Sequence, residues 1–298
     1  MKTYSACIPC FFRQILGTAR LSGASDDTLI SLSKEAAPIL AGIDDSLSPP
    51  ENAYRFYRHI TAALDNPDPY RQVREESNKE AMAAADELAP QVSQAEDPLL
   101  EALFAAIAGN IIDFGANTDI NVSREVRNIV RAERSRSMHE SGELFAYPEL
   151  LQALSAAEKS GGTLLYIGDN AGEIVFDRML ITEITHRFPS VAVTFAVRGE
   201  PILNDAVLED AVQVGMEEAA EVIASGSVIP GTVPHTTNAD FRRRYDTADI
   251  VISKGQGNFE SLTEYLDREV FFLFVAKCPV IAAYLECDIG DIILTRRG

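Results

Sequence analysis

Two side chains with oxygen donors, Asp169 and Asn170, follow the apolar segment 163–167 after a single glycine. A carboxylate beside an amide oxygen suits a hard cation such as Mg²⁺ or Mn²⁺. Asp205 follows the next apolar segment and completes a candidate set of three metal ligands if the two segments are neighbouring strands. An alternative of equal weight is that Asp169, Asn170 and Asn204 cap helices, because Asp and Asn are favoured at that position.

A glycine-rich run, Lys254-Gly255-Gln256-Gly257-Asn258, lies between the apolar segment 249–253 and a stretch with helical periodicity. Glycines let backbone N–H groups approach an anion, and the start of a helix adds a favourable dipole. The spacing is neither that of a Walker A loop nor that of the dinucleotide fingerprint. Beside the acidic turns, the run predicts a phosphate site in which Lys254 neutralises charge on a phosphate that a metal also binds.

Three further polar residues are candidates for substrate binding. Lys277 ends the apolar run 270–276, so we expect it at the same edge of the sheet, although a lysine at a strand end is more often solvated. Asn110 and Asp113 lie three positions apart on a predicted helix and therefore share a face. Their polarity interrupts an otherwise apolar helix, so they either end it or point into a cleft.

Cys7 and Cys10 form a CxxC pair near the start of the chain. A structural zinc site needs further ligands, but the sequence has no second CxxC and its four histidines are scattered. A thioredoxin-like motif follows a strand, and no strand pattern precedes this pair. The favoured interpretation is a helical pair of reduced thiols.

The elements that position these residues divide the chain near residue 150. Residues 1–150 are predicted to be helical, with helix starts at Ser25 and at Asp97-Pro98. Residues 151–298 alternate apolar runs with helical stretches, which predicts an α/β fold with a mostly parallel sheet covered on both faces. The predicted strands are residues 163–167, 191–197, 249–253, 270–275 and 289–294, with a further short candidate at 227–230.

The net charge and the apolar segments of the sequence argue against two kinds of partner, nucleic acids and membranes. The formal net charge of −19 argues against a nucleic-acid surface, which needs clustered Lys and Arg. No segment approaches the roughly 20 apolar residues of a membrane span, and the first residues lack the apolar core of a signal peptide. A cytoplasmic location with no membrane partner is therefore expected. The oligomeric state is not predicted.

Several separated motifs, in the expected order, resemble the metal-dependent damage-control phosphatases, an ARMT-like family also known as domain of unknown function 89. The resemblance spans nearly the whole chain, and the N-terminal CxxC is similar to that of the compact prokaryotic branch. The motifs are Cys7-Ile8-Pro9-Cys10, Gly109-Asn110-Ile111-Ile112-Asp113, Gly168-Asp169-Asn170-Ala171-Gly172-Glu173, Asn204-Asp205 and Lys254-Gly255-Gln256-Gly257-Asn258-Phe259-Glu260.

The resemblance implies a helical N-terminal domain on a Rossmann-like α/β/α domain, and hydrolysis of phosphate monoesters with Mn²⁺, Mg²⁺, Co²⁺ or Ni²⁺. The metal ligands of the family fall on Asp169, Asn170 and Asp205. Its substrate contacts fall on Glu173, loop 254–258 and Lys277. The implied substrate is a small phosphorylated metabolite, such as a sugar phosphate. The nucleophile is either water or a carboxylate, for which Asp169 is the candidate.

Two other classes of protein compete with this interpretation. A non-catalytic metal- or nucleotide-binding protein, with the CxxC as a sensor, would bind its ligand without turnover. A methyltransferase with a Rossmann-like sheet is disfavoured, because Asp169-Asn170 stands where that class has a glycine-rich first turn.

Overall fold

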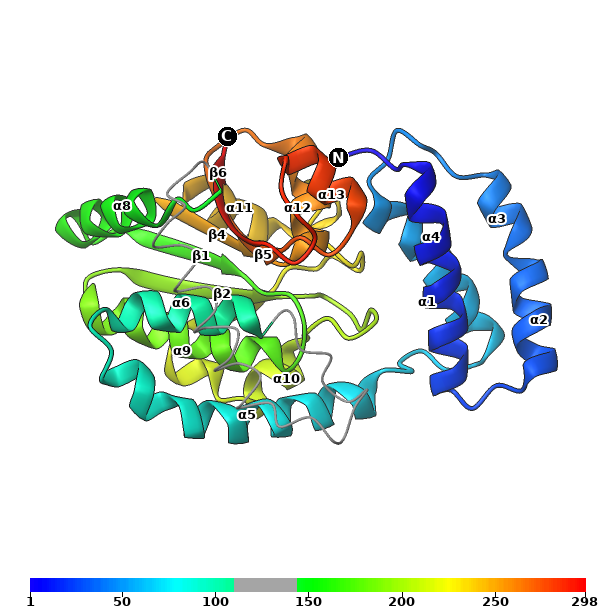
Figure 1. The fold of residues 1–298 in the computed structure, drawn as a ribbon, viewed down its shortest axis with the longest axis horizontal. Coiled ribbons are helices and arrows are strands. Elements are labelled where there is room, and N and C mark those ends of the chain that lie inside the picture. The colour runs from blue at the N-terminus through cyan, green and yellow to red at the C-terminus, as the bar shows by residue number, and fades with distance from the viewer. Residues whose placement is uncertain (110–143) are drawn as a thin grey trace.

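The computed structural model describes residues 1–109 and 144–298, which form a helical lobe beside a larger body with a central sheet (Figure 1). The predicted positions Asn110 and Asp113 lie outside the described residues. The α/β class predicted from the alternating pattern is confirmed. No helix within the described ranges combines the length and the apolar character that a membrane span requires.

The N-terminal lobe has its own apolar core. Phe11 and Phe56 stack with their ring centroids 5.2 Å apart, and Ile15, Leu32 and Ile60 are buried in the same cluster. Ser25 caps the second helix as predicted, since its hydroxyl accepts the backbone N–H of Thr28. The elements are η1 (Ser5–Cys7), α1 (Ile8–Leu21), α2 (Asp26–Glu35), α3 (Ala37–Ala41) and α4 (Pro49–Ala63).

The sheet has six strands in the order β3-β2-β1-β4-β5-β6. All neighbours are parallel except β6, which pairs antiparallel with β5. The chain runs outward from β1 through β2 to β3, and on the other side through β4 to β5, so the strand order reverses between β1 and β4. Ligands in such sheets bind at the carboxyl ends of the strands beside this reversal. The strands are β1 (Thr163–Ile167), β2 (Ala192–Val197), β3 (Glu221–Ala224), β4 (Ile250–Lys254), β5 (Val270–Val275) and β6 (Ile292–Arg297).

Helices cover both faces of the sheet because successive strand residues are buried on alternate sides. Leu164 and Tyr166 belong to one core, and Leu165 and Ile167 belong to the other. The first core joins the sheet to α5 (Arg71–Ser93), α6 (Pro98–Ala108), α8 (Tyr147–Ser160), α9 (Glu173–Arg187) and α10 (Leu208–Gln213). The second joins it to α11 (Ala239–Thr247), α12 (Gln256–Leu262) and α13 (Pro279–Leu285). The short 3₁₀ turns are η2 (Met216–Glu218), η3 (Pro234–Thr236) and η4 (Thr263–Tyr265).

α5 and α6 precede the sheet by many residues, yet α6 packs on α9 and β5 and α5 packs on α9. Asp97 caps α6 as predicted by accepting the backbone N–H of Leu100, and Pro98 is its first residue. In Figure 1, α5 runs from the helical lobe along the outside of α9. The domain boundary near residue 150 stays a prediction. α5 and α6 precede that boundary in the sequence but belong to the first core of the sheet.

One predicted strand is wrong. The candidate at 227–230 is a loop, and the third strand lies earlier, at Glu221–Ala224. Gly226 takes a φ of +77°, which ends the extended path before residue 227. The backbone of Ser227 still accepts the N–H of Gly199, so the loop continues beside the chain that leaves β2. The five other strands are confirmed, with shifts of up to three residues at their starts.

Candidate active site

The two acidic turns meet at the carboxyl edge of the sheet, as the metal-site prediction requires. Asp169 and Asn170 follow β1, and Asp205 lies in the loop after β2. Asn170 and Asp205 form an isolated antiparallel bridge. The backbone N–H of Ala206 donates to the carbonyl of Asp169 at 2.8 Å. The two turns are therefore fixed to each other through their backbones.

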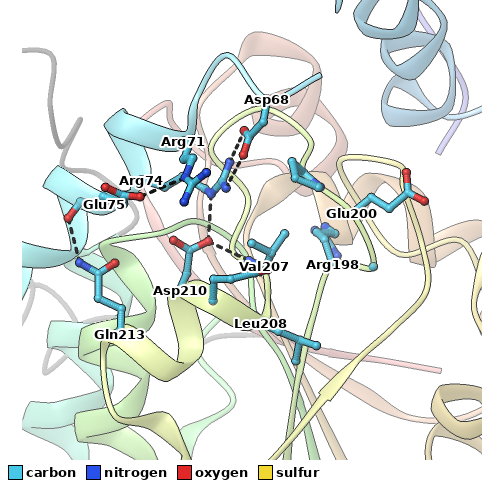
Figure 2. A pocket seen from close by; sticks show the side chains of 13 residues that line it. Asp68, Arg71, Arg74, Glu75, Arg198, Glu200, Val207, Leu208, Asp210 and Gln213 are labelled. Atoms are coloured by element: carbon cyan, nitrogen blue, oxygen red, sulfur yellow. Dashed lines mark hydrogen bonds and ion pairs between the residues drawn. The ribbon is translucent and has the colours of Figure 1, made fainter. Parts of the chain in front are cut away.

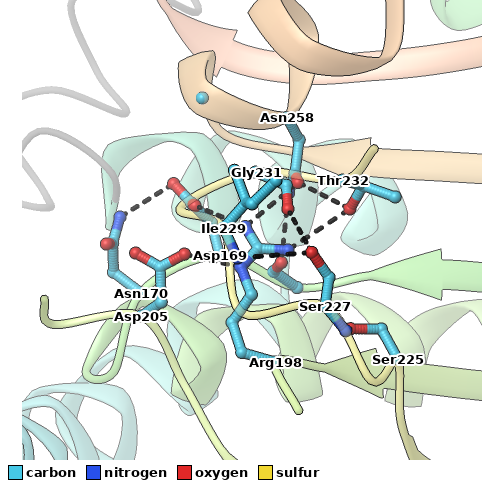
Figure 3. A network of polar contacts seen from close by, with 12 residues as sticks. Asp169, Asn170, Arg198, Asp205, Ser225, Ser227, Ile229, Gly231, Thr232 and Asn258 are labelled. Carbon is cyan, nitrogen blue, oxygen red and sulfur yellow. Dashed lines mark hydrogen bonds and ion pairs between the residues drawn. The ribbon is translucent and has the colours of Figure 1, made fainter. Parts of the chain in front are cut away.

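Arg198 lies between the two carboxylates and was not predicted as a site residue. Its Nε donates to Asp205 Oδ2 at 2.6 Å, and its Nη2 lies 3.5 Å from Asp169 Oδ1. The same guanidinium donates to Thr232 at 3.2 Å and to Asn258 at 3.0 Å (Figure 3). The sequence contains one feature that could have identified Arg198. A charged residue directly follows the apolar run 191–197, where a longer core strand would have an apolar residue.

The electrostatics of this cluster favour an additional positive charge. Burial raises the pKa of the Asp169 carboxyl well above its usual range, and the charges of Asp205 and Glu173 raise it further. The charges of Arg198 and Lys277 act in the opposite direction. Burial likewise raises the pKa of Asp205, against the effect of Arg198. Closely spaced buried carboxylates are stabilised as anions by a bound cation, and oxygen donors suit a hard one.

The start of the glycine-rich loop packs directly against Asp169. Gly255 has a φ of +81°, and a Cβ on this residue would lie 1.9 Å from Asp169 Oδ2. Only glycine adopts this conformation readily and leaves room for the carboxylate. The loop therefore approaches the acidic turn through bare backbone, as expected for a site that holds a metal and an anion together.

Asn258, predicted to contact substrate, is buried and connects three segments of the site. Its amide nitrogen donates to the carbonyl oxygens of Lys254 and Gly168, at 2.7 and 3.2 Å. Its amide oxygen accepts from Arg198 and from Thr232. Gly257 also lies close to a neighbouring backbone, since an added Cβ would lie 2.7 Å from the carbonyl oxygen of Pro230.

Lys254 is fully buried beneath the turn rather than at its surface. Its ammonium donates to the carbonyl of Ala106 at 2.9 Å, to Glu173 at 2.7 Å and to Asp177. An ammonium has three protons, so these three acceptors use its full donor capacity. Burial alone would lower the pKa of Lys254, but the charges of Asp177 and Glu173 outweigh this effect and raise it.

Glu173 is the first residue of α9 and is held from two sides. Lys254 binds its Oε1, and the amide of Asn170 donates to its Oε2 at 3.1 Å. The same amide donates to Asp169 Oδ2 at 2.8 Å. Gly172, not Asp169 or Asn170, occupies the N-cap position of α9, so the capping alternative is wrong for this helix.

Lys277 lies just past β5 and is exposed. It is close enough to Asp169 for its charge to lower the pKa of that carboxyl. Its backbone N–H donates to Gln256 Oε1 at 2.9 Å, and the Gln256 amide donates to Glu260 at 2.7 Å. Gln256 therefore links its loop to the end of β5.

One cysteine adjoins the site, since the Gln256 amide donates to Cys278 Sγ at 3.5 Å. All four cysteines are free, and burial raises the pKa of Cys7. Across residues 1–109 and 144–298, no three histidine, cysteine, aspartate or glutamate side chains already converge in the way that metal ligands do. The candidate ligands Asp169 and Asp205 are instead directed toward Arg198.

A cavity of about 510 Å³ opens beside Arg198 (Figure 2). The start of α5 contributes Arg71 and Arg74 to its wall, and the loop after β2 contributes Glu200. Arg74 and Asp210 form a buried ion pair on the wall, with a distance of 2.9 Å. The cavity thus adjoins Arg198, the residue that binds both candidate metal ligands.

Comparisons with known proteins agree on one family. The family model described as the damage-control phosphatase ARMT1-like domain matches residues 3–293. A damage-control phosphatase of Pyrococcus horikoshii is 30% identical, and the match covers 99% of this chain and 98% of that protein. An uncharacterised protein of Methanocaldococcus jannaschii is 33% identical, with 100% of this chain and 96% of that protein covered. The crystal structure of a protein of the DUF89 family from P. horikoshii superposes with a TM-score of 0.87 at 29% identity, over 100% of both chains.

Proposed function

The chain belongs to the damage-control phosphatase ARMT1-like family, and on that premise we propose that it is a metal-dependent phosphatase of small phosphate monoesters. Sugar phosphates and damaged phosphometabolites are the substrate classes that we propose. The observation that supports this best is the pair of buried carboxylates, Asp169 and Asp205, at the strand ends beside the reversal of strand order.

In this proposal Asp169, Asn170 and Asp205 hold a divalent ion, which is Mn²⁺, Mg²⁺, Co²⁺ or Ni²⁺. The residues fit such an ion because their donors are oxygens and because their buried charge exceeds what Arg198 neutralises. When bound, the ion neutralises charge on the phosphate and polarises phosphorus. Arg198 binds both carboxylates and thereby holds them next to each other.

Lys277 and backbone N–H groups of residues 256–258, at the start of α12, bind the phosphate oxygens in this proposal. Phosphoryl transfer depends on charge neutralisation and positioning more than on covalent chemistry. Lys277 suits this role because it is exposed and lies within electrostatic range of Asp169. Lys254, expected at first to bind phosphate, contributes through the Glu173 carboxylate that it holds.

Water is the nucleophile in the proposed reaction. It attacks phosphorus opposite the ester oxygen, the bond from phosphorus to that oxygen breaks, and the alcohol leaves with a proton. Asp169 is less suited to attack phosphorus, because its carboxylate already binds Arg198 and the amide of Asn170. Glu173 is buried beneath this cluster, where Lys254 and the amide of Asn170 hold it against the same turn.

Release of inorganic phosphate tests the proposal. The protein is treated with a chelator and then assayed on a panel of sugar phosphates, with and without Mn²⁺. We expect turnover of at least one ester that depends on added metal. Tight binding of Mn²⁺ without turnover on any ester would favour the non-catalytic binding protein, and turnover that is equal without metal would contradict metal dependence.

A further inference from the structure

Asn78 is a buried polar residue of α5 whose side chain bonds to the turn before α9 and to α10, the helix that follows the loop of Asp205. Its amide oxygen accepts the backbone N–H of Gly172 at 2.7 Å. Its amide nitrogen donates to Asp210 Oδ1 at 3.0 Å and to Gln213 Oε1 at 2.9 Å. The carboxylate can only accept and the N–H can only donate, so these partners fix the orientation of the amide.

The bond to Gly172 reaches the turn that carries Asp169 and Asn170. Gly172 has a φ of +79° and precedes the first residue of α9. Backbone N–H groups at a helix start have no partner within the helix and need one from elsewhere. Asn78 supplies that partner from 94 positions away in the sequence.

The bond to Asp210 reaches the loop that carries Asp205. Asp210 Oδ2 accepts the backbone N–H of Val207 at 3.0 Å, two residues beyond Asp205. Arg74 donates to the same oxygen at 2.9 Å through its Nε. Its two terminal nitrogens bind both oxygens of Asp68, at 2.7 and 2.9 Å.

Arg74 and Asn78 are four residues apart and therefore lie on one face of α5. We propose that these two residues act as a clamp that holds the two acidic turns, which are joined through their backbones, in place on α5, with Asn78 as the positioning residue for metal binding. The inference rests on the proposed function, because it concerns the metal site of that reaction. A buried asparagine is costly unless it is fully bonded, and here its bonds go to the turn of Asp169 and to the helix that follows the loop of Asp205.

The clamp predicts that Asn78→Leu weakens Mn²⁺ binding by about 10- to 100-fold, as the loss of an outer-shell partner does at other metal sites. Calorimetry measures the dissociation constant, and kinetics at rising Mn²⁺ separate affinity from kcat. Excess metal should restore most of kcat, because the reacting groups themselves are intact.

Asn52→Leu is the matched control. Asn52 is also buried, and its amide donates to Thr3 at 2.9 Å and to the carbonyl of Asp44 at 2.8 Å within the N-terminal lobe. It should lower the melting temperature without changing the Mn²⁺ dissociation constant. An effect on metal binding that is equal in both variants would reduce Asn78 to a general structural role.

A folded Asn78→Leu variant with the parental Mn²⁺ dissociation constant would overturn the clamp. If that variant does not fold, Asn78→Ser is tested by the same criterion, because it also removes the bond to Gly172. Failure of the proposed function gives a different result, since the parent protein itself would then show no metal-dependent release of phosphate.

Discussion

Lys254 and Glu173 are 81 positions apart, yet the Lys254 ammonium lies 2.7 Å from Glu173 Oε1 and both side chains are buried. The pair joins the end of β4 to the start of α9, directly beneath the turn that carries Asp169. Asp177, one helical turn further along α9, binds the same ammonium and accepts from the hydroxyl of Tyr166 at 2.7 Å. This ion cluster joins the first turns of α9 to the ends of β1 and β4.

Removing the charge of Lys254 should destabilise the fold. Lys254→Met leaves two buried carboxylates without their cation, which costs about 3–5 kcal/mol of unfolding free energy. Adding Asp177→Asn should recover part of this loss, because one of the two unpaired charges is then removed. Urea denaturation of the single and double variants measures both effects. Lys277→Met, at an exposed site, is the control and should stay within about 0.5 kcal/mol of the parent. A stability of Lys254→Met close to that control would contradict this prediction.

Gly255→Ala should abolish metal binding while the protein still folds. The new Cβ would lie 1.9 Å from Asp169 Oδ2, so the carboxylate has to move away from its position. Gly23→Ala is a matched control, since Gly23 has a similar φ of +75° and no atom within 4 Å of the added Cβ. Both variants place alanine at a positive φ, so both carry the same kind of backbone strain. Calorimetry should show that only Gly255→Ala loses Mn²⁺ binding. Equal Mn²⁺ affinity in the two variants would show that Asp169 tolerates the displacement.

Lys277→Ala should lower kcat/KM for a phosphate ester by about 10- to 150-fold, the effect of losing one charge-assisted contact of 1.5–3 kcal/mol. The Mn²⁺ dissociation constant should stay near the parental value, because lysine is not a metal ligand here. Lys159→Ala removes another exposed lysine, at the end of α8 before β1, and should leave steady-state kinetics unchanged. Parental kcat/KM in Lys277→Ala would remove Lys277 from the phosphate site.

The stability of the fold should depend on the titration of Asp177. Burial raises the pKa of Asp177 from 3.8 to about 6, although Lys254 opposes the shift. The folded state thus retains a proton that the unfolded state has already lost, so the contribution of this group falls as the pH rises from 4 through 6. Asp177→Asn removes that titration. Relative to the parent, its unfolding free energy should rise with pH by up to about 3 kcal/mol between pH 4 and 7.5. A constant difference across this range would contradict the assignment.

Local sequence patterns correctly predicted strands and helix starts that depend on interactions between residues close in the sequence. Apolar runs gave β1, β2, β4 and β5 nearly to the residue, and Ser25 and Asp97 marked helix starts because a side-chain cap is a local interaction. The third strand was misplaced because Glu221–Ala224 is only partly buried at the sheet edge and lacks a long apolar run.

The contacts between distant segments were not predictable from the sequence. Lys254 lies at the end of a strand and before a glycine, and a lysine there can be either exposed or buried. It is buried because α6 and α9 pack over it. Arg198 and Asn78 have partners 60 and 94 positions away. No local pattern encodes such pairings. The turns of the candidate ligands were identifiable because strand ends in a parallel sheet converge at one edge.

Binding of Mn²⁺ to the parent protein, Asp205→Asn and Asp249→Asn is the most direct test of the metal site. Asp249 is an exposed carboxylate that binds the backbone N–H of Thr163 at the opposite end of β1, so its variant controls for the loss of one acidic charge near the sheet. We predict that the parent and Asp249→Asn bind one Mn²⁺ with similar dissociation constants in calorimetry. Asp205→Asn should bind at least 10-fold more weakly while remaining folded, because it loses a charged ligand. Equal Mn²⁺ affinity in all three proteins would contradict a metal site built on Asp169, Asn170 and Asp205.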